Sequence, residues 1–256
     1  MKIVTLNVNG FRGNVKKNDY VSNSELISNL NNLKFYIDNL CIDDESIVVL
    51  QEIPHKMLID KSVSPWIWKE LEMFRMFKTL FEKNYKVFYP RFLIDSEQCT
   101  VALAHKNTKW NYTSKNIIKY NRWHHYGNKL IEIEKNNDTL LGVHVSPCEE
   151  MWNILLSSLE ENEVTFIVGD FNAYEKRGIM NEKPMQLRNL GYSPLISSSV
   201  ITNFIYESSI DNLYINSECK LTNGIHIDVK RTDDFFTDHA ACMFEFYEKD
   251  RQNKNH

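Results

Sequence analysis

A short apolar segment that ends in a glycine, a carboxylate and an amide most strongly constrains the fold of this chain. The segment is 164–168, and Gly169, Asp170 and Asn172 follow it. An apolar run with no polar residue after Thr165 predicts a strand buried on both faces. Asp170 and Asn172 then lie at the carboxyl end of that strand, where open α/β sheets bind their ligands. The alternative is a simple turn, because Asp and Asn side chains also bond to their own backbone.

The composition is that of one globular domain. Of the 256 residues, 43% are hydrophobic and 25% are charged, a balance that excludes a disordered chain. No uninterrupted apolar segment approaches the roughly 18 residues of a membrane span, and Met1 and Lys2 lead directly into a predicted strand rather than a signal peptide. We therefore expect a cytoplasmic protein without stable membrane insertion. It should fold as a single domain over residues 1–256, with a disordered tail at 249–256.

The cysteines support the same compartment. They are odd in number, widely spaced and free of any CxxC pairing, which favours small buried thiols in a reducing environment over disulfides. A zinc site built from cysteines is not expected. The five are Cys41, Cys99, Cys148, Cys219 and Cys242.

The formal net charge of −4 argues against a dedicated, high-affinity nucleic-acid binder, which is usually basic. One region departs from this average, because residues 105–131 include no acidic residue while basic and aromatic residues alternate there. This pattern suits a phosphate backbone with stackable bases. The alternative is a solvated strand edge protected by lysines. The side chains concerned are Lys106, Lys109, Lys115, Lys119, Arg122 and Lys129, with Trp110, Tyr112, Tyr120, Trp123 and Tyr126.

Hydrophobic periodicity predicts an alternation of strands and helices along the rest of the chain. Helices are expected over residues 22–40, 65–81, 149–159 and 182–190. Strands are expected over residues 2–10, 46–50, 85–89, 99–104, 129–134, 139–145, 200–206, 213–216, 224–229 and 240–247. The apolar residues of 65–81 favour core packing but occupy more than one stripe, which leaves open a flap toward substrate or membrane. Two similar halves of mixed elements predict an α/β sandwich of two packed sheets.

Polar side chains recur where the predicted strands end. Hard divalent cations prefer carboxylate and amide oxygens, and phosphoryl transfer also needs a base for water and donors for the developing charge. The polar residues at the predicted strand ends include groups of all these kinds. They are Asn7, Glu52, Asp170, Asn172, Asp211 and Asp238, with His144 and His239 in equivalent places.

Six short segments resemble, in order, the motifs of the endonuclease/exonuclease/phosphatase superfamily, which has the deoxyribonuclease I-like fold. Each motif is short, but the ordered set extends from residue 5 to residue 239 and so covers nearly the whole chain. The segments are TLNVNG (5–10), LQE (50–52), GVHV (142–145), GDFN (169–172), SIDN (209–212) and TDH (237–239).

The resemblance implies a four-layer α/β sandwich of two packed mixed β-sheets flanked by helices, with a catalytic pocket at one end. It also implies Mg²⁺ as the cofactor, with Mn²⁺ as a substitute. By the matching positions, Glu52 is the principal metal ligand, and Asn7 and Asp238 help to hold or orient the ion.

The same matches imply roles for the remaining residues. His239 acts on the scissile phosphate or its attacking water, and Asp211 orients it through a carboxylate–imidazole hydrogen bond. Asp170 positions and deprotonates the water, and Asn172 holds a phosphate oxygen. His144 is a second phosphate or leaving-group contact, whose carboxylate partner cannot be located from the sequence.

Two positions depart from the family pattern. Ala241 stands where a proline usually follows the last histidine, which should alter the local turn more than the chemistry. His144 stands where the abasic-site enzymes of the superfamily typically carry tyrosine, which weakens the resemblance to DNA-repair members. Two simpler roles also stay open, because Asn7 fits a strand-end cap and Asp211 fits a turn acid.

The favoured hypothesis is a Mg²⁺-dependent hydrolase that cleaves phosphodiesters by in-line attack of water. We expect it to be a nuclease with DNA rather than RNA as substrate, and no protein partner is implied. A second hypothesis is a phosphatase or phosphodiesterase acting on lipid headgroups or small phosphorylated metabolites, as the net acidity and the apolar segment 65–81 would suit. A third is a non-catalytic binding module, against which the intact set of costly buried charges argues.

Overall fold

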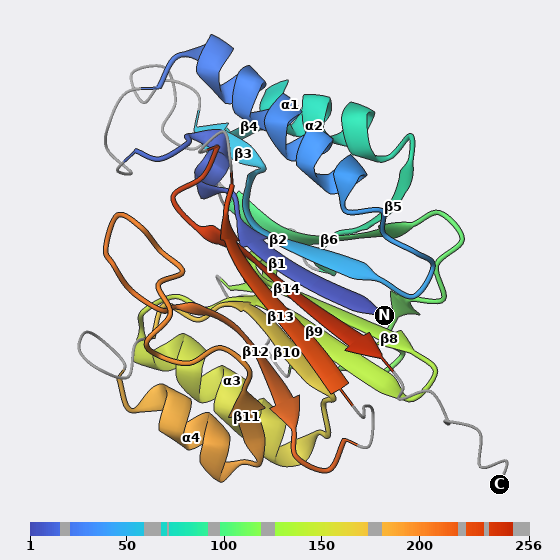
Figure 1. The fold of residues 1–256 in the computed structure, drawn as a ribbon, viewed down its shortest axis with the longest axis vertical. Helices are drawn as coiled ribbons and strands as arrows, with labels where there is room; N and C mark the ends of the chain where they lie inside the picture. The colour runs from blue at the N-terminus through green and yellow to red at the C-terminus, as the bar shows by residue number, and fades with distance from the viewer. Residues whose placement is uncertain are drawn as a thin grey trace, which may run out of the picture.

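Two mixed β-sheets pack face to face in the computed structural model of this chain, and helices cover both outer faces (Figure 1). This arrangement confirms the four-layer α/β sandwich that the sequence predicts. The structure describes residues 1–15, 21–58, 68–70, 72–91, 98–118, 126–173, 181–219, 224–232 and 236–247.

The first sheet has the strand order β13-β14-β1-β2-β6-β5 and is built around one parallel pair. Strands β1 and β2 run parallel with Asn7 opposite Gln51, whereas the other neighbouring strands are antiparallel. Helix α1 (Asn23–Asn39) connects this pair, because parallel neighbours need a long crossover. The strands are β1 (Lys2–Asn7), β2 (Ile47–Pro54), β5 (Tyr85–Phe88), β6 (Gln98–His105), β13 (Gly224–Arg231) and β14 (Ala240–Tyr247).

The second sheet repeats this plan with the order β11-β12-β10-β9-β8-β7. Its parallel pair is β9 and β10, with His144 opposite Asp170, and helix α3 (Glu149–Glu161) makes the crossover. The remaining neighbours are antiparallel. The strands are β7 (Asn111–Tyr112), β8 (Leu130–Lys135), β9 (Asp138–His144), β10 (Phe166–Asp170), β11 (Tyr192–Pro194) and β12 (Asp211–Asn216).

The shared plan brings the polar ends of the strands together. Parallel neighbours end at the same edge of their sheet, and the antiparallel strands β12 and β14 begin at that edge. The two edges adjoin, because Asn7 Nδ2 at the end of β1 lies 2.9 Å from Asp170 Oδ2 at the end of β10. The motif residues therefore share one end of the sandwich.

Three apolar layers hold the four structural layers together. One lies between the first sheet and helices α1 and α2 (Glu72–Phe81), one between the two sheets, and one between the second sheet and helices α3 and α4 (Lys183–Asn189). Along β1, Val4 and Leu6 face the helices and Ile3 faces the other sheet. Both faces of the central strands are thus buried, which explains their nearly continuous apolar sequences.

Helix α1 begins where the sequence predicts. Ser22 Oγ accepts a hydrogen bond from Glu25 N at 3.3 Å, and Ser22 N donates to Glu25 Oε2 at 2.9 Å. This reciprocal capping box satisfies backbone groups of the first turn. Leu30, Leu33 and Ile37 then bury one face of the helix.

The prediction of one helix over residues 65–81 is wrong in its first part. Strand β4 (Trp68–Glu70) pairs with β3 (Lys56–Leu58), and the helix begins at Glu72. Pairing with a segment ten residues upstream overrides the local helical pattern. Within α2, Phe74, Phe77 and Phe81 are buried in the core, which confirms the packing interpretation for that part. Residues 65–67 lie outside the described residues.

The strand predicted over residues 200–206 is also wrong. Residues 204–207 form a turn, and Asn203 pairs through isolated bridges with Ser208 and His239. The backbone reverses here, because Asn203 N donates to Ser208 O at 2.9 Å and Ser208 N donates back to Asn203 O at 3.1 Å. Such a short reversal leaves no room for a regular strand.

Structural contacts account for several side chains of the basic and aromatic stretch. Trp110 is fully buried and donates its indole N–H to Glu45 O at 2.8 Å. Lys109 Nζ lies 2.9 Å from Glu45 Oε1, and Tyr112 Oη accepts from Tyr89 N at 2.8 Å. The stretch Lys119–His125, with Lys119, Tyr120, Arg122 and Trp123, falls outside the described residues, so its predicted contact with nucleic acid stays a prediction.

All five cysteines are free thiols. Cys99 and Cys242 are buried as predicted, whereas Cys41 is exposed and Cys148 and Cys219 are partly exposed. Among the residues that the structure describes, none of the helices has the length and hydrophobicity to cross a membrane.

Candidate active site

A pocket of about 140 Å³ opens at the edge where the central strands of both sheets end. Five of the eight predicted site residues line it, and the other three bond to lining residues. The five are Glu52, Asp170, Asn172, Asp238 and His239.

Asn7 joins the two sheets within the site. Its Nδ2 donates to Glu52 Oε1 at 3.2 Å and to Asp170 Oδ2 at 2.9 Å. The orientation of the amide is fixed, because Asn9 N donates to Asn7 Oδ1 at 2.9 Å. Asn7 therefore caps its strand, as the simpler alternative proposed, and also holds two carboxylates with the same amide.

Glu52 projects from a β-bulge in β2. The register of β2 against β6 shifts between Leu50 and Ile53, and Glu52 has a left-handed backbone with φ 60°. A bulge re-aims the side chain, and a non-glycine residue in this conformation is typical of functional sites. Gln98 Nε2 donates to Glu52 Oε2 at 3.0 Å. Burial alone would raise the pKa of Glu52, but the imidazoles of His144 and His239 outweigh it and lower the pKa.

His144 has the carboxylate partners that the sequence could not identify. Its Nε2 lies 3.4 Å from Glu52 Oε1 and 3.9 Å from Asp170 Oδ2. His144 is buried at the end of β9. His144 therefore contacts the same two carboxylates, those of Glu52 and Asp170, that accept hydrogen bonds from Asn7.

Asp170 is buried with both oxygens hydrogen-bonded. Its Oδ2 accepts from Asn7, and its Oδ1 accepts from Asn172 N at 2.8 Å. Burial, followed by the nearby carboxylate of Asp211, raises the pKa of Asp170 to about 7. Gly169 is required before it, because a Cβ there would lie 1.9 Å from Val143 O and the residue has φ 145°. The backbone that carries Asp170 therefore needs a glycine at the preceding position.

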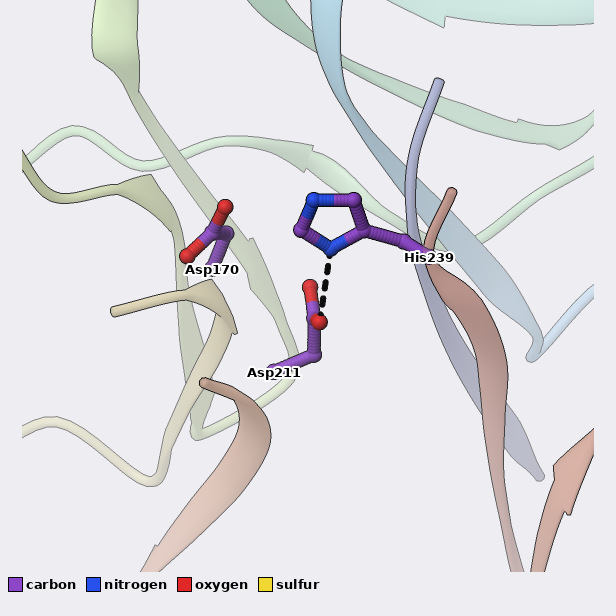
Figure 2. Close-up of side chains that lie close together, drawn as sticks. All are labelled: Asp170, Asp211 and His239. Atoms are coloured by element: carbon purple, nitrogen blue, oxygen red, sulfur yellow. Dashed lines mark hydrogen bonds and ion pairs between the residues drawn. The ribbon is translucent and has the colours of Figure 1, made fainter. Parts of the chain in front are cut away.

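Asp211 and His239 form a buried pair (Figure 2). His239 Nδ1 donates to Asp211 Oδ2 at 2.8 Å, and neither side chain is more than 6% exposed. Burial would lower the pKa of His239, but Asp211, with Asp170 and Asp238, raises it. Asp211 begins β12 and is the partner of the imidazole, so the turn-acid alternative does not describe it.

Asn172 and Asp238 complete the wall of the pocket. Asn172 has a left-handed backbone with φ 46°, and its Nδ2 donates to Val145 O at 3.1 Å. Asp238 is buried, which raises its pKa. Its Oδ2 accepts from Asn203 Nδ2 at 3.3 Å, whereas its buried Oδ1 has no hydrogen-bond partner among the residues that the structure describes. A buried oxygen without a partner is a natural ligand for a cation.

Among the described residues, one group of side chains comes close enough to hold a divalent ion. One atom each of Asp170, Asp211 and His239 lies within 4.8 Å of the others. However, Asp211 Oδ2 already accepts from the His239 imidazole, so these two atoms are engaged with each other. Glu52 and Asp238 also line the pocket, and carboxylates are the ligand type that suits a hard cation.

Some residues of the site gave little or no sequence signal. Gln98 and Asn203 bond directly to predicted site residues. However, Asn203 lies within the predicted strand 200–206, and Gln98 immediately precedes the predicted strand 99–104. Thr202 Oγ1 accepts from Asp211 N at 3.0 Å. Thr237, which does lie in a motif, donates from Oγ1 to Asn7 O and accepts from His239 N at 3.2 Å. Its hydroxyl links the ends of β1 and the segment before β14.

No family model matches the sequence, and none of the curated proteins matches it. Solved structures do match over nearly the whole chain. An AP endonuclease from Archaeoglobus fulgidus is 14% identical with a TM-score of 0.60, covering 96% of this chain and 99% of that chain. An endonuclease/exonuclease/phosphatase family protein from Leptotrichia buccalis is 14% identical with a TM-score of 0.58, covering 96% and 99%.

A third similar structure is TDP2 from D. rerio complexed with a single-strand DNA product. It is 14% identical with a TM-score of 0.56, and the match covers 96% of this chain and 98% of that chain. At such identity the likeness concerns the fold. It confirms the fold that the ordered motifs predict.

Proposed function

We propose, from the fold that this chain shares with structures of the endonuclease/exonuclease/phosphatase type, that it is a metal-dependent hydrolase of phosphodiester bonds and a nuclease acting on DNA. The observation that carries the proposal is the pocket where carboxylates from both sheets meet the Asp211–His239 pair. Phosphodiester hydrolysis needs a base for the attacking water and donors for the charge that develops on the phosphate. The pocket contains groups of both kinds.

Glu52 and Asp238 are the ion ligands of this proposal, and Asn7 holds the Glu52 carboxylate in place. Mg²⁺ prefers carboxylate oxygens, and Mn²⁺ accepts the same ligands. The lowered pKa of Glu52 keeps its carboxylate ionised, and Asp238 Oδ1 is buried with no hydrogen bond to any described residue. When bound, such an ion stabilises the negative charge that develops on the phosphate.

Asp170 is the base of this proposal. A carboxyl group with a pKa near neutrality is matched to proton transfer at neutral pH, and the pKa of Asp170 is raised to about 7. Asp170 orients the water and accepts one of its protons. The water oxygen forms a bond to phosphorus as the bond from phosphorus to the leaving oxygen breaks. The leaving oxygen then takes up a proton from solvent water, and Asp170 releases the proton that it accepted to solvent.

His239, Asn172 and His144 have the supporting roles. Held by Asp211, His239 contacts an oxygen of the scissile phosphate, and Asn172 binds another from the pocket wall. His144 remains our predicted second contact for the phosphate or leaving group. Its position beside Glu52 and Asp170 supports an additional task, which is to fix the two carboxylates.

DNA is the favoured substrate because two of the similar structures are described as an AP endonuclease and as a complex with a DNA product. The alternative is a phosphatase or phosphodiesterase for lipid headgroups or small metabolites, which the net charge of −4 favours. The phenylalanines of α2 that suited a lipid-facing flap are instead buried in the core. Free thiols support a reducing, cytoplasmic compartment for either activity.

The test is to incubate the purified protein with plasmid DNA and with single-stranded DNA, in Mg²⁺ and in EDTA, beside the Glu52→Gln variant. We expect cleavage only with the metal, reduced at least ~100-fold in the variant. Cleavage in EDTA, or a variant as active as the wild type, would remove the proposed mechanism. Turnover of phospholipid headgroups in liposomes or of small phosphate esters, with nucleic acid left intact, would choose the alternative.

A further inference from the structure

The side chain of Asn203 contacts two of the predicted site residues at once. Its Nδ2 lies 2.9 Å from His239 Nε2 and donates to Asp238 Oδ2 at 3.3 Å. The amide cannot turn over, because Tyr206 N donates to Asn203 Oδ1 at 2.9 Å. In the neutral imidazole whose Nδ1 hydrogen is donated to Asp211, Nε2 accepts one amide hydrogen of Asn203, and Asp238 Oδ2 accepts the other. Asn203 is only 3% exposed.

The backbone around Asn203 is as firmly placed as its side chain. Asn203 is bridged to Ser208 and to His239, so the loop 202–208 lies directly against the segment that carries the histidine. Phe204 N donates to Asp238 O at 2.9 Å, and Ala240 N donates to Thr202 O at 2.7 Å. These bonds bracket His239 on both sides.

The preceding residue holds the other member of the buried pair. Thr202 Oγ1 accepts from Ile210 N at 2.9 Å and from Asp211 N at 3.0 Å. Thr202 therefore fixes the backbone of Asp211, while Asn203 bonds to the ring nitrogen of His239 that Asp211 leaves free. One dipeptide thus positions both partners.

We propose that Asn203 is a positioning residue, which holds the imidazole of His239 at Nε2 until an oxygen of the substrate phosphate replaces the amide there. With Asp211 at Nδ1 and Asn203 at Nε2, the plane of the ring is fixed before substrate arrives. The Asp238 carboxylate bonds to the same amide. Asn203 therefore also fixes the distance between His239 and Asp238, the predicted ion ligand. The catalytic consequence rests on the function proposed above, whereas the hydrogen bond itself does not.

The first experiment measures this hydrogen bond without any activity. The ring ¹⁵N signals of His239 and His144 are recorded in EDTA for the wild type, Asn203→Asp and Asn203→Ala. Asn203→Asp retains the acceptor for Tyr206 N and nearly the same volume, but it replaces the amide hydrogens by a negative charge, and Asn203→Ala removes the amide without adding a charge. We expect the Nε2 signal of His239 to move in both variants while the signals of His144 stay in place.

Asn162→Asp is the matched control for this experiment. Asn162 Nδ2 also donates two hydrogen bonds, to Ser158 O at 2.9 Å and to Ile117 O at 3.2 Å, but it lies at the far end of α3. It should leave the His239 signals unchanged. A His239 Nε2 signal that stays at the wild-type position in both Asn203 variants would overturn the proposal, whatever the protein hydrolyses.

The second experiment measures turnover of single-stranded DNA in Mg²⁺. Asn203 lines the pocket, but its amide is bonded to His239 and Asp238, so loss of the amide should lower kcat about 10- to 100-fold with little change in KM. Asn162→Asp should retain the wild-type kcat. Variants with shifted His239 signals but normal kcat would overturn the positioning role. If the wild type hydrolyses no phosphodiester, the proposed function fails, and the first experiment still decides whether Asn203 fixes the ring.

Discussion

The ionisable side chains of this site are largely buried, and most of them form hydrogen bonds with neighbouring residues. Asp170 uses both oxygens, and Asp211 gives one of its oxygens to His239. Buried charges are costly unless paired in this way. Glu52 and Asp170 could be predicted because each follows an apolar run, whereas Asp211 and Asp238, which stand at or just before the start of strands, were identified through the resemblance to the family motifs. Asn203 and Gln98 could not be predicted, because an amide in or next to a predicted strand does not stand out from the surrounding sequence.

We predict that Asp211→Asn lowers kcat for phosphodiester cleavage by about 10² to 10⁴ without unfolding the protein. The amide no longer supports the imidazole as the carboxylate does, and losses of this size follow when a supported acid–base group is disturbed. Steady-state kinetics with DNA measures the effect. The matched control is Asp138→Asn at the opposite end of β9 from His144, which should retain wild-type turnover. Equal rates for both variants would contradict the role of the pair.

The pH dependence of stability should reveal the buried carboxyl of Asp170. Its pKa is raised from 3.8 to about 7 in the folded, metal-free protein, chiefly by burial. The folded state therefore holds a proton that the unfolded chain releases, so this contribution to stability is full below the unfolded pKa and is lost as the pH rises toward 7. Asp170→Asn should lack this part of the decline.

Urea unfolding in EDTA, from about pH 4 to about pH 8, measures the free energy of unfolding of both proteins across the range where the group titrates. When the free energy of unfolding is plotted against pH, the slopes for the wild type and Asp170→Asn should differ. Parallel curves across the whole range would show that Asp170 does not titrate as its surroundings indicate.

Elements of the fold position these residues through their ends rather than their middles. The crossovers β1-α1-β2 and β9-α3-β10 place four strand ends at one edge, and these elements are well predicted by hydrophobic period. The bulge at Glu52 and the loop 202–208 were not predicted, because pairing with distant strands decides both. Local pattern likewise gave a helix for residues 68–70, which pair as a strand instead.

The capping box of α1 gives a test at this scale. Ser22→Ala removes the hydroxyl that accepts from Glu25 N and should lower the free energy of unfolding by about 0.5–2 kcal/mol. Because α1 packs on the outer face of the first sheet, kcat should not change. Chemical denaturation and DNA cleavage, measured on the same preparation, separate the two effects. A large loss of kcat in a folded variant would mean that α1 also supports the pocket.

At the scale of the whole molecule, the two sheets are variations on one plan, and neither contains the site alone. Glu52 comes from the first sheet, Asp170 from the second, and Asn7 bonds to both. The order of the motifs along the chain predicted this convergence, since each follows or precedes a strand at the same edge. The sequence could not indicate which hydrogen bonds cross between the sheets, because those depend on how the sheets pack.

Ion binding is the most direct measure of this convergence. Mn²⁺ bound to the protein can be quantified from the loss of the free-ion signal in electron paramagnetic resonance, for the wild type, Glu52→Gln and Asp170→Asn. We predict one ion site, weakened about 10- to 100-fold by each substitution, because Glu52 would bind the ion and Asp170 accepts from the same Asn7 amide as Glu52. Wild-type affinity in both variants would contradict a site assembled from the two sheets.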